Sequence, residues 1–229
     1  MTDSAHPRQI RSFVRRAGRQ TRAQERALTE LWPRFGLDPP APGADLVLDL
    51  PAAFGRPAPC VLEIGFGNGD ALAGMATDSP DRNFLGAEVH APGVGHCLLA
   101  IEKLGLTNVR LLMQDAVEVL RERLPAHSLA GVHLYFPDPW HKKRHHKRRL
   151  VQPEFVALLA ARLAPGGYFH VATDWPEYAA HIQEVMCGSP DFHAAGPAPA
   201  GGQRPRTRFE ARGERLGHPI WEAVYLRHS

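Results

Sequence analysis

The chain has 229 residues, of which 44% are hydrophobic, so it is long enough for one domain with a sizeable core. No run approaches the length of a membrane span, and the Arg-containing N-terminal segment has no apolar stretch, so we expect neither a membrane anchor nor a secretory signal. Three widely spaced cysteines match no disulfide framework and no CxxC metal pattern, which predicts buried thiols in the reducing cytoplasm.

The formal net charge of +3 hides a strong asymmetry. Residues 8–26, 141–149 and 204–215 together hold 18 Lys/Arg and 3 Glu, whereas the other 189 residues carry a net charge of −12. Basic clusters on an otherwise acidic chain are typical of a protein that binds nucleic acid. The alternative is that the three segments are solvated and never adjacent in space.

The N-terminal part of the chain divides into two segments. Residues 1–37 are rich in arginine, and we predict a mobile basic arm that ends in a short helix over 21–32. Residues 38–59 are rich in proline and glycine, which predicts an irregular connection. A single domain is expected to follow over 60–229.

Within 60–229, short apolar runs alternate with helical patterns. We predict strands over 60–65, 83–89, 109–115, 131–137, 168–174 and 219–227. Helices are predicted over 70–80, 95–105, 116–124, 152–167 and 176–187, and a loop over 188–206. This alternation predicts parallel strands joined by right-handed crossovers, which is a doubly wound α/β sheet.

An acidic residue stands at or near the end of each of the first five predicted strands: Glu63, Glu88, Asp115, Asp138 and Asp174. In doubly wound sheets, ligands bind at the carboxyl ends of the strands. Any one of these acids could instead be a helix N-cap, and Asp115 is a natural N-cap for the helix that follows it. Five acids at one edge nevertheless indicate a binding site.

A glycine-rich turn, Gly65-x-Gly67-x-Gly69, follows the first strand. With Glu88 after the second strand to accept hydrogen bonds from ribose hydroxyls, this pattern fits a dinucleotide or S-adenosylmethionine. The carboxylate of Glu63 would crowd a pyrophosphate but suits an ammonium group and a sulfonium. We therefore favour S-adenosylmethionine, with Gly65 and Gly67 among the residues that bind it.

The motif FPDPWHKKRHHKRR over 136–149 places Asp138 between two prolines and next to nine basic residues. One interpretation is a solvated charged loop; the other is a binding segment for a polyanion beside a reactive carboxylate. Trp140 fits either stacking on a nucleobase or packing in the core. His141 and His145 are four residues apart, but the surrounding cations would repel a metal ion, so we predict no metal site.

Several segments together resemble the bacterial tRNA (guanine-N7)-methyltransferases. They are LEIGFGNGDALAGMA, NFLGAEVHAPGVGHCL, QDAVEVL, FPDPWHKKRHHKRRLVQPEFV, FHVATDWPEYA and TRFEARGERLGHPIWEAVY. The resemblance implies a class I methyltransferase fold, which is a Rossmann-like seven-stranded sheet with an antiparallel last strand. It also implies methyl transfer from S-adenosylmethionine to N7 of guanine 46 in the variable loop of tRNA.

The resemblance further implies roles for individual residues. Contacts to the methyl donor fall to Glu63, Glu88, Asp115 and Asp138, and Asp138 is also the catalytic candidate. The substrate contacts implied are Lys142, Asp174, Thr207, Arg208, Phe209 and Glu210. In the basic loop, the residues expected to contact RNA are Arg144, Lys147, Arg148 and Arg149. Arg208 departs from the lysine usual in the family, which keeps the charge but changes the donor geometry.

Two other functions remain open at this point. One is methylation of a different RNA base, and the other is a non-catalytic RNA-binding α/β protein. The tRNAs modified, a monomeric or homodimeric state, a need for a second subunit, and the roles of 38–59 and 188–203 also remain open.

Overall fold

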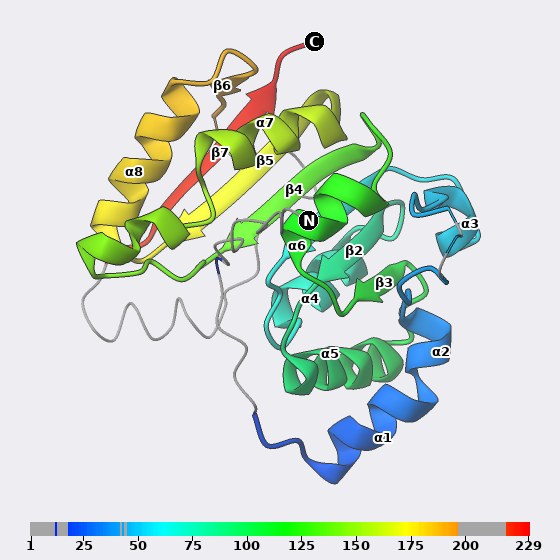
Figure 1. The fold of residues 1–229 in the computed structure, drawn as a ribbon. Helices are drawn as coiled ribbons and strands as arrows, with labels where there is room; N and C mark the ends of the chain where they lie inside the picture. The colour runs from blue at the N-terminus through cyan, green and yellow to red at the C-terminus, as the bar shows by residue number, and fades with distance from the viewer. Residues whose placement is uncertain (1–11, 13–17, 42, 44, 197–218) are drawn as a thin grey trace, which may run out of the picture.

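One mixed sheet of seven strands forms the centre of the computed structural model, which describes residues 12, 18–41, 43, 45–196 and 219–229 (Figure 1). The strands are β1 Cys60–Ile64, β2 Asn83–Ala87, β3 Val109–Leu112, β4 Leu129–Tyr135, β5 Leu163–Thr173, β6 Phe192–Ala194 and β7 Trp221–Arg227. Their order is β3-β2-β1-β4-β5-β7-β6.

The pairing confirms the predicted topology. Strands β1 to β5 are mutually parallel, and β7 lies antiparallel between β5 and β6. The chain leaves β1 toward β2 on one side and later returns to β4 on the other. The switch point of the sheet therefore lies between β1 and β4, which is where doubly wound sheets bind ligands.

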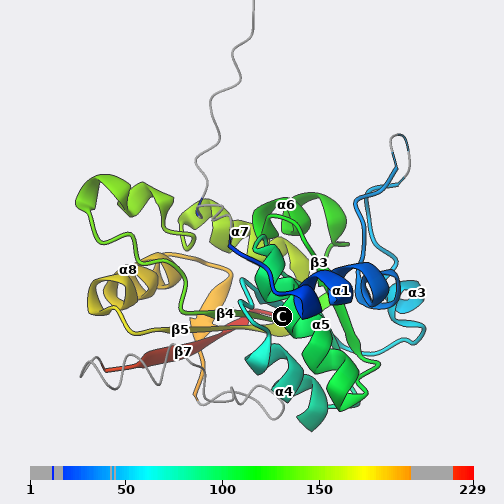
Figure 2. The same cartoon turned by 90° about the horizontal axis from the view of Figure 1, so that it is seen from below.

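Helices cover both faces of the sheet (Figures 1 and 2). They are α1 Arg22–Glu30, α2 Trp32–Phe35, α3 Leu50–Phe54, α4 Asp70–Asp78, α5 Ala91–Leu104, α6 Ala116–Glu118, the π-helix η1 Val119–Arg123, the 3₁₀-helix η2 Lys143–Arg148, α7 Pro153–Arg162 and α8 Pro176–Cys187. One core cluster joins the sheet to α3, η1, α7 and α8, and a second joins it to α1, α2, α4 and α5. No helix in the described part of the chain has the length and apolar character needed to cross a bilayer.

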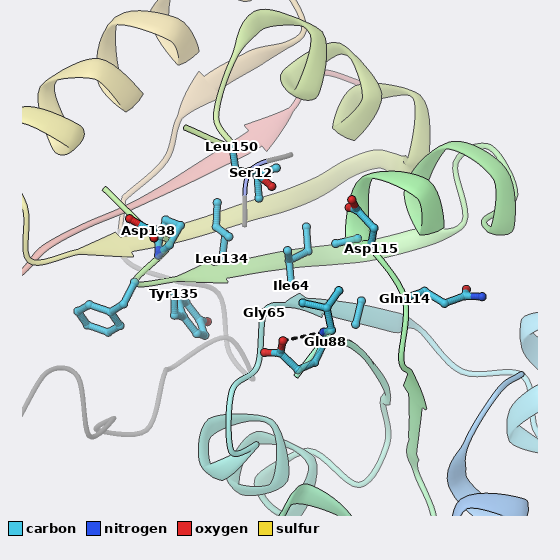
Figure 3. A pocket seen from close by; sticks show the side chains of 15 residues that line it. Ser12, Ile64, Gly65, Glu88, Gln114, Asp115, Leu134, Tyr135, Asp138 and Leu150 are labelled. Atoms are coloured by element: carbon cyan, nitrogen blue, oxygen red, sulfur yellow. Dashed lines mark hydrogen bonds between the residues drawn. The ribbon is translucent and has the colours of Figure 1, made fainter. Parts of the chain in front are cut away.

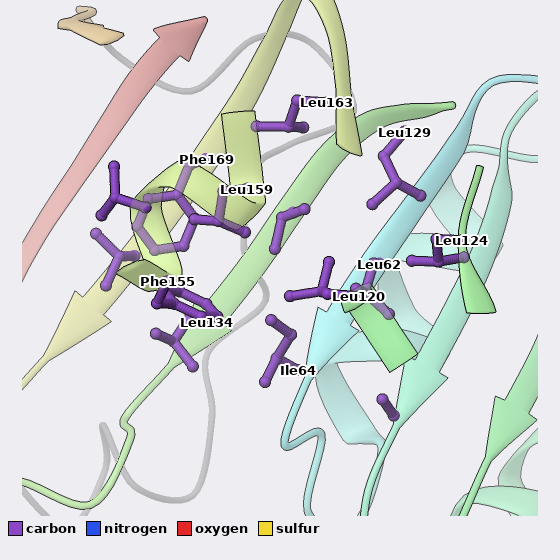
Figure 4. Packing of buried hydrophobic residues seen from close by; sticks show 14 of the residues in the cluster. Leu62, Ile64, Leu120, Leu124, Leu129, Leu134, Phe155, Leu159, Leu163 and Phe169 are labelled. Carbon is purple, nitrogen blue, oxygen red and sulfur yellow. The ribbon is translucent and has the colours of Figure 1, made fainter. Parts of the chain in front are cut away.

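Side chains along the central strands point alternately to the two faces of the sheet, and this divides the buried core into two clusters. Leu62 and Ile64 of β1 belong to the cluster under α7 (Figure 4), whereas Val61 packs toward α4 and α5. Successive side chains of a strand point to opposite faces, and a parallel sheet covered on both sides buries both sets. The near-continuous apolar runs in the sequence follow from this arrangement.

The N-terminal helix predicted over 21–32 is present as α1 and packs on the outer side of α5 (Figure 1). Thr21 and Gln24 form a capping box, with Thr21 Oγ1 accepting from the Gln24 amide at 3.3 Å. A Cβ atom on Gly95 of α5 would lie only 3.0 Å from the Gln24 carbonyl oxygen, so this glycine lets α1 approach α5 closely. The part of the predicted mobile arm that the structure describes as α1 is thus packed against α5.

Three other expectations were wrong in detail. The predicted loop contains β6, which forms because Phe192 is buried and β7 offers a free edge for pairing. The predicted irregular connection contains α3, which is capped by Asp49. Cys60 and Cys97 are buried as expected, but Cys187 is exposed at the end of α8.

A buried polar network crosses β4, β5 and β7. The His133 Nε2 atom lies 2.9 Å from the Tyr168 hydroxyl, and the Tyr135 hydroxyl lies 3.0 Å from His170 Nδ1. His170 Nε2 lies 2.6 Å from Glu222 Oε1, which is partly exposed. Burial, with smaller contributions from the charges of His170 and Arg82, lowers the pKa of His133 well below its usual value.

This lowered pKa predicts a loss of stability in acid. The unfolded chain takes up a proton on His133 near its ordinary pKa of about 6.5, whereas the folded protein does not. Stability is therefore full above about pH 6.5 and falls below it by up to about 1.4 kcal/mol per pH unit. In urea unfolding between about pH 7 and pH 5, His133→Gln should show a flatter pH dependence than the wild type. Parallel curves for the two proteins would contradict the assignment.

Candidate functional site

A cavity of about 220 Å³ opens at the carboxyl ends of β1, β2 and β4 (Figure 3). It lies at the switch point of the sheet. Apolar side chains such as Ile64 and Leu134 form its floor, and polar side chains such as Glu88 and Asp138 lie at its rim. Its lining includes Ser12, Ile64, Gly65, Ala87, Glu88, Val89, Gln114, Asp115, Leu134, Tyr135, Asp138 and Leu150. Three of the five acids expected at the strand ends thus line one cavity: Glu88, Asp115 and Asp138.

The glycine loop after β1 is shaped by positive φ angles, which are 66° at Gly65, 57° at Gly67 and 78° at Gly69. A Cβ atom on Gly69 would lie 2.3 Å from Cys97 Sγ, so the loop also requires glycine for its close packing on α5. At Gly65, by contrast, a Cβ atom would meet no other atom within 4 Å. The loop therefore lies tightly on the helix and leaves open space on the cavity side.

The Glu88 carboxylate is held by three backbone amides. Its Oε2 accepts from Gly67 N at 2.9 Å, and its Oε1 accepts from Val89 N at 2.6 Å and His90 N at 3.0 Å. These three hydrogen bonds from the backbone fix the position of the carboxylate. Glu88 thus presents a fixed negative charge at the cavity.

Asp115 combines two roles. As the N-cap of α6, its Oδ1 accepts from Val117 N at 2.9 Å, as its place in the sequence predicted. Its side chain also lines the cavity, after β3, which is the strand next to the one that precedes Glu88. The N-cap bond holds this carboxylate in one orientation.

Asp138 lies in a strained turn directly after β4. Phe136 and Trp140, on either side of it, have φ angles of 52° and 48°, which residues other than glycine rarely adopt. Asp138 Oδ1 accepts from Trp140 N at 3.0 Å, and the side chain is exposed at the mouth of the cavity. Such strain costs about 1–3 kcal/mol per residue and is often found at functional sites.

The basic run after Asp138 is a folded loop that contains η2. The Trp140 indole N–H donates to the Ser12 carbonyl oxygen at 3.0 Å, and the Arg148 guanidinium lies 3.9 Å from the centroid of the indole ring. His145 contacts the same ring edge-on. The Trp140 side chain is therefore a central contact of the folded loop. The interpretation of this segment as a solvated charged loop is wrong.

Arg149 differs from the other basic residues of the loop. It is only 3% exposed, and its guanidinium donates to the Pro139 carbonyl oxygen at 2.9 Å while lying over the Tyr178 ring. Arg144 and Lys147 are exposed, and Arg148 is half-buried. The structure thus places Arg149 under the loop rather than on the surface expected to contact RNA.

Three of the remaining expected site residues do not line the cavity, and four fall outside the described part of the chain. Glu63 is 3% exposed and faces α4 and α5, where its charge adds to burial in raising the pKa of Cys97. Lys142 is exposed at the start of η2, and Asp174 is half-buried at the end of β5. The expected substrate residues that fall outside the described part of the chain are Thr207, Arg208, Phe209 and Glu210.

Several cavity residues were missed by sequence reasoning. Tyr135 forms part of the floor, where its hydroxyl is held by His170, and Leu150 and Ser12 close the cavity from distant parts of the chain. Tyr135 lies in the predicted fourth strand, three residues before Asp138, so its place at the strand end was available as a signal. Ser12 and Leu150 carried no such signal.

The residues present fit S-adenosylmethionine. Fixed carboxylates suit its ammonium, sulfonium and ribose hydroxyls, and the apolar side chains of Ile64, Leu134 and Leu150 suit an adenine ring. The open space over Gly65 gives the ligand room to approach the backbone. Among the described residues, no group of three or more His, Cys, Asp or Glu is arranged to hold a metal ion.

Solved structures of low sequence identity share the fold. TrmN from Thermus thermophilus matches with a TM-score of 0.54 at 19% identity, covering 79% of this chain and 47% of that one. An rRNA methylase from Streptococcus thermophilus matches with a TM-score of 0.51 at 17% identity, covering 75% and 88%. The architecture is therefore the class I methyltransferase fold that the resemblance implied.

Sequence relatives are much closer. The model of the family described as "Putative methyltransferase" matches residues 57–223. The tRNA (guanine-N(7)-)-methyltransferase of Alkalilimnicola ehrlichii is 56% identical over 97% of this chain and 94% of the relative. The protein of the same name from Methylococcus capsulatus is 53% identical over 96% and 95%. With such identity over nearly the full length of both proteins, this chain belongs to the tRNA (guanine-N7)-methyltransferase family.

Proposed function

We propose that this protein transfers the methyl group of S-adenosylmethionine to N7 of a guanine in tRNA, at position 46 of the variable loop, in the cytoplasm. The observation that carries the proposal is one edge of the sheet, where a cavity with three fixed carboxylates adjoins a folded basic loop. The names of the close relatives support the substrate, and the motifs around Asp138 and at 207–210 support the position.

The cavity residues would hold the cofactor, which supplies an electrophilic methyl group on a sulfonium sulfur. Glu88 is placed to accept hydrogen bonds from the ribose hydroxyls, while Gly65 and Gly67 let the backbone approach the ligand. Asp115 contributes a second acceptor across the cavity. Glu63 lies behind the glycine loop, and we assign it to the donor site through its charge beneath that loop.

The chemistry requires positioning more than proton transfer. N7 of guanine has an exposed lone pair and carries no proton, and methylation turns the purine into a cation. A general base is therefore unnecessary, and catalysis depends on alignment and on a charge that favours the cationic product. The exposed carboxylate of Asp138, held in place by the Trp140 amide, is suited to accept from guanine's amino donors and to stabilise that charge.

In this proposal the basic loop and other residues at the same edge bind the tRNA and position its guanine at Asp138. We assign the phosphate contacts to Arg144, Lys147 and Arg148 and leave out the buried Arg149. Contacts nearer the base are assigned to Lys142, Asp174 and the motif at 207–210. In this proposal residues 60–229 form the methyltransferase domain, and 1–37 with the 38–59 connection extend it.

The function is tested by methyl transfer to bulk tRNA from S-adenosylmethionine carrying a radiolabelled methyl group, followed by nucleoside digestion. We expect label in N7-methylguanosine. A tRNA with 7-deazaguanine at position 46 should still bind, because phosphate contacts supply most of the affinity, but it should accept no methyl group. Label in another nucleoside, or methylation of the deaza substrate at that position, would reject the proposed reaction.

The cofactor assignment predicts that Glu88→Ala weakens binding of S-adenosylmethionine about tenfold or more, because a charge-assisted hydrogen bond contributes roughly 1.5–3 kcal/mol. Calorimetry without tRNA measures this affinity. Glu102→Gln, an exposed acid on α5, serves as the control and should bind like the wild type. A folded Glu88→Ala protein with wild-type affinity would refute the assignment.

The chemical assignment predicts that Asp138→Asn lowers the methyl-transfer rate about a hundredfold or more, as when one preorganised electrostatic contact is lost. Asparagine keeps an oxygen that can accept from the Trp140 amide, so the turn should persist. Single-turnover kinetics at saturating tRNA measures the rate, and Asp81→Asn on the exposed turn before β2 is the matched control. An Asp138→Asn enzyme of full activity would show that the charge is not needed.

A further inference from the structure

A second cavity, also of about 220 Å³, adjoins the first and shares Ser12, Asp115 and Leu150 with it. Its other walls come from η1, the end of the basic loop and the start of α7. The charged side chains that line it are Arg121, Lys147, Arg148, Arg149, Asp115 and Glu154, so its lining carries a net positive charge. The proposed function leaves Arg121 without a role.

The π-helix η1 fixes the direction of Arg121. Val119 and Leu120 before it, and Arg123 and Leu124 after it, are buried, which leaves Arg121 and Glu122 exposed in the middle. Arg123 Nη1 also donates to Gln114 at 3.1 Å. π-Helical turns are rare and are frequent at functional sites. Here both ends of the turn are buried, and of its two exposed residues Arg121 lines the cavity whereas Glu122 does not.

The backbone around Arg121 is compatible with an anion. Carbonyl groups at the end of a helix carry partial negative charge and would repel a phosphate. In η1, Arg162 of α7 donates to the Leu120 carbonyl oxygen at 2.5 Å and to the Arg121 carbonyl oxygen at 2.9 Å. A guanidinium from the neighbouring helix thus offsets this charge.

The basic side chains that line the second cavity differ in their contacts with the rest of the protein. Arg149 is buried, and Arg148 lies over Trp140. Within the described part of the chain, no salt bridge pairs Arg121 or Lys147 with an acid. Two exposed cations on one cavity without a paired acid attract an external anion.

We infer that this second cavity binds a backbone phosphate of the tRNA, held jointly by Arg121 and Lys147 with Arg148 at its edge. The inference rests on the proposed function. Because the two cavities share Asp115 and Leu150, the phosphate belongs to a nucleotide close to the target guanine. Phosphate contacts set the position of a nucleic acid without reading its sequence, so this site fixes the position of the RNA relative to Asp138.

The test uses Arg121→Gln, Lys147→Gln and the double variant, with Lys103→Gln as the control. Lys103 is exposed near the end of α5, on the other face of the sheet, and its replacement removes the same charge. Binding of tRNA is measured over a range of salt concentrations, and S-adenosylmethionine affinity is measured without tRNA.

Each single variant should weaken all tRNAs alike, roughly three- to tenfold, with unchanged affinity for S-adenosylmethionine. The double variant should lower the salt slope by about 0.7–0.9 in total, because one phosphate is lost, and the two single effects should not add. Lys103→Gln should keep the wild-type slope.

Two results would overturn the inference. A wild-type slope in the double variant would exclude a phosphate at this cavity, and a slope change twice as large with additive effects would mean that Arg121 and Lys147 contact separate phosphates. Both leave the proposed function intact if the wild type still methylates tRNA. A wild type that neither binds nor methylates tRNA would reject the proposed function itself, and the inference with it.

Discussion

The hydrogen bonds between the Glu88 carboxylate and the backbone around it are the interaction on which the cofactor edge of this structure depends. One side chain receives an amide from the glycine loop, at Gly67, and two from the turn that enters α5. The loop in turn approaches α5 so closely that a Cβ atom on Gly93 would lie 2.2 Å from the Gly67 carbonyl oxygen. Removing the carboxylate would leave three amides without this acceptor, so the shape of the loop and the proposed grip on ribose depend on the same atoms.

The conformation of the basic loop depends on a buried charge, that of Arg149. Arg149 is placed inside, where it joins the Pro139 carbonyl and the Tyr178 ring, and Trp140 is covered by Arg148. These contacts hold a run of like charges in one conformation, although mutual repulsion would otherwise extend it. In the proposed function the loop therefore offers RNA a preformed surface, which lowers the entropic cost of ordering the loop on binding.

Much of the fold was predictable because its signals are local. Apolar runs ending in acids predicted the parallel strands and the binding edge, and the helix predicted over 21–32 is present as α1. The differences arise where distant parts of the chain decide the outcome. Pairing with β7 creates β6 from a stretch with one buried apolar residue, and packing under Pro139 buries an arginine that the sequence presents as one basic residue among nine.

The site was predictable to a similar degree. Strand ends and glycines pointed to Gly65, Glu88, Asp115 and Asp138, which all line the cavity. Contacts made across the sheet left no local trace in the sequence, as with Ser12 and Leu150. The π-helical turn of η1 was also hidden, because its residues read equally well as an ordinary helix.

The antiparallel direction of β7 has a consequence for how the site is assembled. Trp221 pairs with Thr173, at the carboxyl end of β5, so the chain enters β7 at the edge that carries Asp138 and Asp174. A parallel last strand would begin at the opposite edge. Reversing one strand thus brings the start of β7 to the edge that carries Asp138 and Asp174, without a further crossover through the fold.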